Sequence, residues 1–316
     1  MRPSLVVFGF LGVVSPLAGQ TPAWPPSAGH TQIPIWPGAA PHAPPVVAPE
    51  TLSITRPHEH LVADRPWAYL ENVSRPTLTV YAPTGQNTGA AVVVFPGGGY
   101  QILAIDLEGT EVCDWLISRG ITCVLLKYRV PNAGRSWDQS CGCDRNTASS
   151  MPLEDAQRAI GLLRYHATAW HIDPHKVGVL GFSAGGHLVA AVSTHFERRV
   201  YTPIDSADLQ SSRPDFAVAL YPGHLYDPRR HALNATIRVT HATPPTFLLQ
   251  AENDRVDDVR NALVYYAALK QAGVPAELHL YAEGGHGFGL RRTRFPITAW
   301  PSLVEAWLQS IGVTTP

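Results

Sequence analysis

The stretch Lys176–His187 (K-V-G-V-L-G-F-S-A-G-G-H) constrains the fold of this chain more than any other segment. It begins with the Val- and Leu-rich pattern of a strand buried on both faces, then breaks into a Gly-x-Ser-x-Gly motif around Ser183. Gly181 and Gly185 suit a sharp strand-to-helix turn, because a Cβ at either position would collide with neighbouring chain. Residues 186–191 predict a helix whose first N–H groups lie beside the Ser183 hydroxyl and favour an oxyanion there.

The motif alone does not decide the chemistry, because a small-residue turn that merely packs well has the same pattern. The rest of the chain supplies the context. The sequence predicts strands at 77–81, 90–95, 121–128, 215–221, 246–250 and 276–281, besides the strand before Ser183, and those at 90–95 and 121–128 are continuous apolar runs. Helical periodicity predicts helices at 107–118, 153–170, 256–272 and 301–311. This alternation predicts an α/β fold with a mostly parallel central sheet and helices on both faces.

Size and charge narrow the class of protein. The 316 residues suffice for one large α/β domain or two small ones, and 45% apolar with 16% charged residues is typical of a globular chain. The formal net charge is −1, and the sequence has no Lys/Arg-rich block. We therefore expect neither nucleic acid nor a membrane as a partner.

The N-terminus predicts export. Arg2 precedes an apolar run over residues 5–14, and small residues follow near Gly19. This pattern is typical of a secretory signal peptide at 1–19. An N-terminal helix packed on the domain is the alternative. Residues 20–50 form a proline-rich arm that we expect to lie extended along a catalytic domain at 51–316, anchored by its tryptophans. The expected location is the periplasm or the extracellular space.

Four cysteines fit an oxidising compartment without requiring one. We expect Cys113 and Cys123 to be small buried thiols, since they lie in a helical and a strand pattern. Cys141 and Cys143 lie in a polar loop, where a disulfide involving one of them is expected and its pairing stays open. No further ligands stand at metal-site spacing, so we expect neither a metal nor a cofactor.

A serine nucleophile needs a base and an acid that orients the base, and on this type of turn they follow in the order Ser, acid, His. His286 lies among glycines just past the strand at 276–281, and Asp254 follows the strand at 246–250. Asp254 is preferred over Asp257 and Asp258, because a residue nearer the strand's end points toward the rim that holds Ser183. Asp257 and Asp258 are expected to begin the next helix.

A glycine loop completes the predicted site. Residues 95–100 (F-P-G-G-G-Y) end an earlier buried strand, and three glycines let main-chain N–H groups approach a substrate oxygen. A packing turn explains one glycine but hardly three. We expect an oxyanion hole made of the N–H groups of Gly98 or Gly99 together with that of Ala184.

Five motifs together resemble one family. They are F-P-G-G-G-Y (95–100), L-L-K-Y-R-V-P (125–131), P-L-E-D-A-Q-R-A-I (152–160), G-F-S-A-G-G-H (181–187) and G-G-H-G-F-G (284–289). The chain resembles α/β-hydrolase serine esterases of the acetylxylan and feruloyl esterase type. The resemblance implies the α/β-hydrolase fold, with Ser183 as nucleophile, His286 as base, Asp254 as acid and no metal.

The same resemblance implies secretion and removal of acetyl or feruloyl groups from plant-wall polysaccharide such as xylan. The chain departs from the family at residues 132–150, an insertion near the active rim that leaves substrate preference open. A peptidase, an amidase or a general small-ester esterase on the same fold is the alternative among enzymes. A non-catalytic carbohydrate-binding module is the alternative from another class. Glycosidase chemistry has no support, since no pair of carboxylates stands out as acid and nucleophile.

Overall fold

The computed structural model describes residues 23–46, 48–56, 61–131, 137–138, 143–144 and 150–315. The predicted signal peptide and most of the insertion at 132–150 lie outside these ranges. Within them, no helix has both the length and the apolar character needed to cross a membrane.

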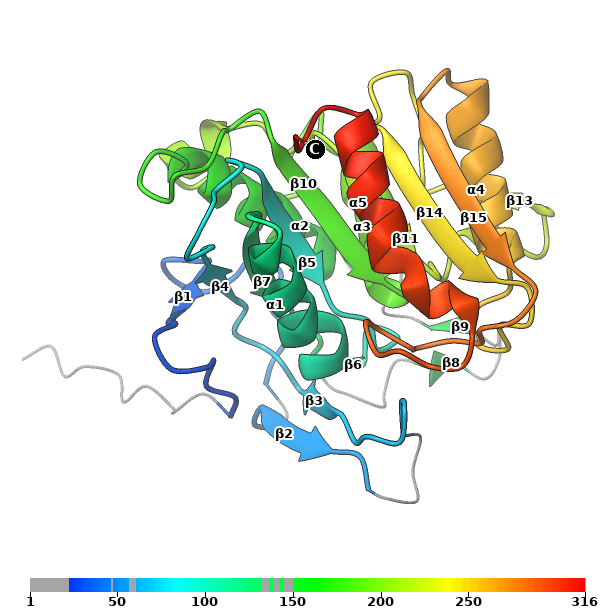
Figure 1. The fold of residues 1–316 in the computed structure, drawn as a ribbon. Helices are drawn as coiled ribbons and strands as arrows, with labels where there is room; N and C mark the ends of the chain where they lie inside the picture. The colour runs from blue at the N-terminus through cyan, green and yellow to red at the C-terminus, as the bar shows by residue number, and fades with distance from the viewer. Residues whose placement is uncertain are drawn as a thin grey trace, which may run out of the picture.

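One large sheet organises the described part of the chain (Figure 1). It has eight strands in the order β1-β4-β7-β5-β10-β11-β14-β15. The strands are β1 (Gln32–Pro34), β4 (Thr77–Tyr81), β5 (Ala91–Phe95), β7 (Thr122–Lys127), β10 (Val177–Phe182), β11 (Ala217–Leu220), β14 (Thr246–Ala251) and β15 (Ala276–Tyr281). Strand β4 is antiparallel to β1 and β7, and all other neighbours are parallel. The carboxyl ends of β5, β10, β14 and β15 therefore meet at one edge of the sheet.

Helices cover both faces of this sheet. In Figure 1, α1 (Glu111–Ser118) and α5 (Trp300–Ser310) lie in front, and α2 (Met151–Tyr165) and α3 (Ala184–Thr194) lie behind. Helix α4 (Arg260–Gln271) packs on β14 and β15 at the far end. The predicted mostly parallel α/β architecture is confirmed. A π-helical turn (Asp106–Thr110) precedes α1, so the helix expected from residue 107 is regular only from Glu111.

Smaller elements surround the main sheet in the described ranges. Strands β2 (Thr51–Ile54), β3 (Ala68–Glu71) and β6 (Ile102–Leu103) form a separate sheet. Two short pairs are β8 (Trp137–Asp138) with β9 (Cys143–Asp144) and β12 (Tyr226–Asp227) with β13 (Ala232–Leu233). Two short 3-10 helices lie at Ser206–Leu209 and Pro296–Ala299.

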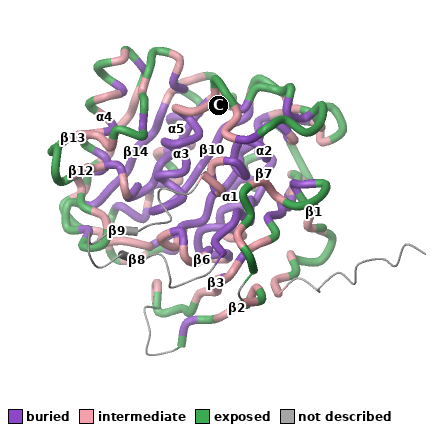
Figure 2. The backbone as a smooth tube through the Cα atoms, turned by 180° about the vertical axis from the view of Figure 1, so that it is seen from behind, coloured by how far each residue is buried: buried purple, intermediate pink, exposed green. Residues whose placement is uncertain are grey.

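The core lies between the main sheet and its helices (Figure 2). Every residue of β5, β7, β10 and β14 is buried. Strands enclosed on both faces do not alternate apolar and polar residues, which explains why these four strands are mostly apolar. Such strands form a rigid base for the loops at their carboxyl ends.

The proline-rich arm is part of this fold. Its residues 32–34 pair with β4 as strand β1, and the described residues 23–46 contain no helix. Trp36 is 5% exposed, and its Nε1 donates a 2.8 Å hydrogen bond to Asp155 Oδ1. Asp155 also pairs with the buried Arg129 at the end of β7. The tryptophan thus anchors the arm, as expected.

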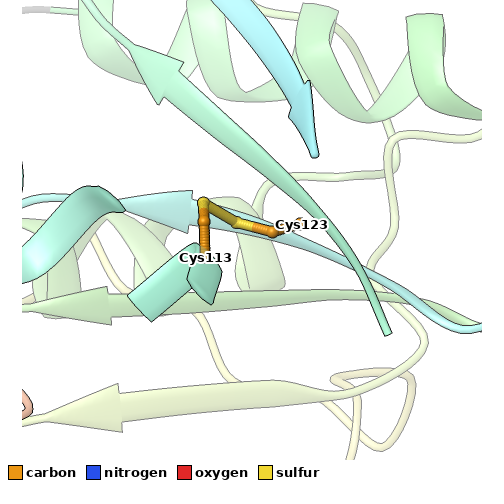
Figure 3. Close-up of a disulfide and its surroundings, with 2 residues drawn as sticks. All are labelled: Cys113 and Cys123. Carbon is orange, nitrogen blue, oxygen red and sulfur yellow. A yellow bond between two sulfur atoms is a disulfide. The ribbon is translucent and has the colours of Figure 1, made fainter. Parts of the chain in front are cut away.

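The cysteine expectation was wrong. Cys113 in α1 and Cys123 in β7 form a disulfide with Cα atoms 5.1 Å apart (Figure 3). Helix α1 packs directly on β7, and this contact brings the two thiols together. Both residues are buried, as predicted, but neither is free. Cys141 and the side chain of Cys143 lie outside the described residues.

Candidate active site

Ser183 occupies a sharp turn between β10 and α3. Its backbone has φ 53° and ψ −119°, a conformation that L-residues rarely adopt. A Cβ on Gly181 would lie 2.2 Å from Gly185 O, and a Cβ on Gly185 would lie 2.1 Å from Phe95 O. Both glycines of the motif are therefore required by space, as the sequence predicted.

The structure brings Ser183, His286 and Asp254 together from the ends of three strands. His286 Nε2 lies 2.9 Å from Ser183 Oγ, and its Nδ1 lies 2.7 Å from Asp254 Oδ2. Because the buried carboxylate of Asp254 can only accept, Nδ1 carries the proton in the neutral ring. Nε2 is then free to accept the proton of the serine hydroxyl. This is the geometry of an activated nucleophile.

Main-chain hydrogen bonds hold the acid and base loops. Asp254 Oδ1 accepts the N–H groups of Val256 (2.9 Å) and Asp257 (3.0 Å), which leaves Oδ2 for the imidazole. The neighbouring Asn253 Oδ1 accepts the N–H groups of Gly284 (3.1 Å) and Gly285 (2.9 Å). Adjacent side chains after β14 thus fix both the orientation of the imidazole and the loop that carries it.

The charges around His286 raise its pKa. Burial alone would lower the pKa, but the hydrogen bond and charge of Asp254 outweigh it, and the charges of Asp257 and Glu108 add to the effect. The imidazolium form of His286 is therefore stabilised.

The glycine loop after β5 faces the same edge. Gly98 has φ +131°, and a Cβ there would lie 2.3 Å from Ile102 O. Gly99 has φ +60° with no atom of the described residues within 4 Å of a Cβ position. Within the described part of the chain, the N–H groups of Gly98, Gly99 and Ala184 donate to no main-chain oxygen. The expected oxyanion donors are thus free to meet a substrate.

Sequence reasoning missed Glu108. Its fully buried carboxylate accepts the Gly97 N–H with Oε2 (2.7 Å) and the Tyr221 hydroxyl with Oε1 (2.7 Å). Burial raises the pKa of this carboxyl, and the two donors and nearby His286 partly offset the effect. The sequence signal that could have indicated burial of Glu108 is its spacing of four residues from the apolar Val112, which places both residues on one helical face.

The expectation for Asp257 was wrong. Helix α4 begins at Arg260, and it is Asp258 that lies at its start, where its Oδ1 accepts the Arg260 N–H at 2.8 Å. Asp257 instead turns toward the nucleophile. Its Oδ2 lies 3.3 Å from Ser183 Oγ and 3.7 Å from His286 Nε2. Burial raises the pKa of this carboxyl.

Among the described residues, no group of three or more His, Cys, Asp or Glu side chains is arranged to hold a metal ion.

Residues 110–311 match the prolyl oligopeptidase family, and this match spans more than half of the chain. The chain belongs to this family. The turn at Ser183 and the order of Ser, Asp and His along the chain agree with this assignment.

Two curated relatives have carbohydrate-related names. An acetylxylan esterase of Xylanibacter ruminicola is 33% identical over 237 residues, which cover 71% of this chain and 45% of that protein. Endo-1,4-beta-xylanase B of Butyrivibrio fibrisolvens is 26% identical over 238 residues, which cover 70% of this chain and 36% of that protein. The chain spans less than half the length of these relatives.

A solved structure matches nearly end to end. The acetyl ester-xyloside bifunctional hydrolase from Caldicellulosiruptor lactoaceticus is 32% identical with a TM-score of 0.68, covering 90% of this chain and 97% of that chain. Together with the family match, this confirms the predicted α/β-hydrolase fold and the resemblance to acetylxylan esterases. The chain therefore has the α/β-hydrolase fold of the serine hydrolases.

Proposed function

We propose that this protein is a serine carboxylesterase that removes acetyl or feruloyl groups from a plant-wall polysaccharide such as xylan. The observation that carries the proposal is the hydrogen-bonded series Ser183, His286, Asp254 beside free main-chain donors. Acyl transfer by a serine nucleophile uses a base beside the hydroxyl, an acid that orients the base, and donors for the oxyanion.

The reaction forms an acyl-enzyme. Ser183 Oγ attacks the ester carbonyl carbon while His286 Nε2 takes the hydroxyl proton. The tetrahedral intermediate collapses, the bond to the alcohol oxygen breaks, and His286 returns the proton to the departing alcohol. Water then attacks the acyl-serine with His286 again as base, which releases the carboxylic acid and regenerates Ser183.

Main-chain donors stabilise the negative charge that forms on the carbonyl oxygen. In this proposal they are the N–H groups of Gly98 or Gly99 and of Ala184, the first residue of α3. The positive end of the α3 dipole favours the same charge. Loss of one such donor typically costs about 3–4 kcal/mol of transition-state stabilisation.

The relatives support an acylated xylan as substrate, since an acetylxylan esterase and an acetyl ester-xyloside hydrolase are among the proteins this chain resembles. Glycosidase chemistry has weaker support. It needs two carboxyl groups across the scissile bond. Of the three carboxyl groups near Ser183, that of Asp254 is hydrogen-bonded to His286 and that of Glu108 is buried with both oxygens hydrogen-bonded, which leaves only Asp257.

An amidase or peptidase is the second candidate among enzymes, because the family name refers to oligopeptidases and triad geometry does not choose ester over amide. Comparison of an acetate ester with the matching acetanilide discriminates the two. An esterase hydrolyses the ester and leaves the anilide intact.

We further propose that the protein is secreted after removal of residues 1–19. The Cys113–Cys123 disulfide supports this, because structural disulfides persist in oxidising compartments. N-terminal sequencing of the protein recovered from the medium or periplasm tests it. A chain that retains Met1 and stays in the cytoplasm would contradict the proposal.

The central test compares 4-nitrophenyl acetate, methyl ferulate and acetylated xylan as substrates, with Ser183→Ala as the control. We expect acetate release from xylan and a loss of about 10⁶-fold in kcat in the variant. An aryl xyloside in the same series tests for glycosidase activity. Esterase activity that survives Ser183→Ala would overturn the assignment of the nucleophile.

A further inference from the structure

The carboxylate of Asp257 lies at the reacting atoms without belonging to the Ser183–His286–Asp254 series. Its Oδ2 is 3.3 Å from Ser183 Oγ and 3.7 Å from His286 Nε2. Its side chain is 13% exposed, close to the 14% of His286. A substrate that reaches the nucleophile therefore also reaches this carboxylate.

The fold holds Asp257 in this place. Its N–H donates to Asp254 Oδ1 at 3.0 Å, and its carbonyl oxygen accepts Gln250 Nε2 at 2.6 Å. A Cβ on Gly223 would lie 2.4 Å from Asp257 Oδ1, so the absence of a side chain at Gly223 creates the space for the carboxylate. The main chain around Asp257 is thus tied on both sides.

The charge of Asp257 is left largely uncompensated. Among the described residues, no Lys or Arg forms an ion pair with it, and the nearby titratable groups are His286, His224 and Asp254. When His286 is neutral and ready to act as a base, the vicinity of Ser183 carries net negative charge. A carboxylate here accepts hydrogen bonds from hydroxyl groups and repels other anions.

We propose that Asp257 determines the charge preference of this esterase, selecting uncharged, hydroxyl-bearing esters and rejecting esters with a carboxylate near the scissile bond. The proposal rests on the function proposed above. A partly hydroxylated sugar fits the preferred class, because a free hydroxyl next to the acylated one can donate to Asp257. A uronic acid substituent next to the ester fits the rejected class.

Two matched substrate pairs test the proposal and locate the effect. 4-Nitrophenyl butyrate against 4-nitrophenyl hemisuccinate places the charge on the acyl side, and 4-acetoxybenzamide against 4-acetoxybenzoate places it on the alcohol side. In Asp257→Asn we expect the anionic-to-neutral ratio of kcat/KM to rise about tenfold in at least one pair at low ionic strength. The pair that responds shows which side of the ester faces Asp257.

Asp258→Asn is the matched control. It removes the same charge one residue along, from an exposed side chain paired with Arg260, and should leave both ratios unchanged. In the unmodified enzyme, 1 M salt should reduce the difference in kcat/KM between the neutral and the anionic substrate of a pair. This measurement does not depend on the folding of a variant. Equal ratios in Asp257→Asn and the parent enzyme, or equal shifts in both variants, would overturn the proposal. Activity retained in Ser183→Ala would instead overturn the proposed function.

Discussion

Glu108 Oε2 accepts a 2.7 Å hydrogen bond from the Gly97 N–H, at the base of the glycine loop. Its other oxygen accepts the Tyr221 hydroxyl, which in turn accepts the Gly289 N–H at 3.0 Å. Gly289 lies three residues beyond His286. A single buried carboxylate therefore connects the loop of the proposed oxyanion donors with the loop of the base.

Removal of this carboxylate should loosen both loops. In Glu108→Ala, the Gly97 N–H and the Tyr221 hydroxyl lose their acceptor, which costs about 1–3 kcal/mol for each buried group left unpaired. We expect a lower melting temperature and a fall in kcat of about tenfold to a hundredfold with KM little changed. Calorimetry and steady-state kinetics measure the two effects. A stable variant with unchanged kcat would contradict the positioning role of Glu108.

The glycine loop allows a matched pair of substitutions. Gly98 has φ +131°, and Gly98→Ala places a Cβ 2.3 Å from Ile102 O. The loop must therefore move, and its N–H groups no longer point toward the oxyanion position. We expect a loss of about 10²- to 10³-fold in kcat.

Gly99→Ala is the control, because it meets only a left-handed φ of +60° and no steric contact. It should cost about 1 kcal/mol of stability or somewhat more and far less activity. Similar kinetic losses in both variants would show that backbone strain, and not the steric contact at Gly98, controls the loop.

The charges around His286 predict the pH profile. His286 must be neutral to take the serine proton, and its pKa is raised, so kcat/KM should fall on acidification with a midpoint above the ordinary 6.5. Asp254, Asp257 and Glu108 all favour the imidazolium. Asp257→Asn should therefore shift the acid limb to lower pH. Asp258→Asn should leave the acid limb of the pH profile unchanged. A shift of the same size in Asp258→Asn would show that the effect does not come from the closeness of Asp257 to His286.

Asp254→Asn should lower kcat more than Asp257→Asn or Asp258→Asn does. An amide can donate to Nδ1, which favours the wrong tautomer and leaves Nε2 protonated. We expect kcat to fall by about 10⁴-fold while the fold is retained. Circular dichroism and ester hydrolysis measure the two properties. Near-normal turnover would show that Asp254 is not the orienting acid.

The Cys113–Cys123 disulfide should affect stability more than activity. It closes a loop with a sequence separation of 10 residues, for which the chain-entropy estimate is about 2–3 kcal/mol. Cys123 lies near the start of β7, at the opposite end of the strand from the active edge. The Cys113→Ser, Cys123→Ser double variant should melt at a lower temperature and keep its kcat at 25 °C. A large loss of kcat in the folded variant would contradict this separation.

The order of elements followed from local sequence. Strands such as β5 and β10 are continuous apolar runs because both faces are covered, and this pattern is visible without coordinates. Gly181 and Gly185 are likewise local requirements of one turn. The places of Ser183, Asp254 and His286 followed in turn, because parallel strands deliver the loops at their carboxyl ends to the same edge.

The sequence by itself therefore determined the fold class and which strand ends carry the candidate site. Tertiary structure alone decided which side chains of different elements contact one another. Asp257 meets Ser183 because Gly223 leaves space for its carboxylate, and Cys113 meets Cys123 because α1 packs on β7. The pattern of polar and apolar residues in a sequence indicates whether a residue is buried, but it does not indicate which residue of another element it contacts. These contacts form only when the helices and strands pack together.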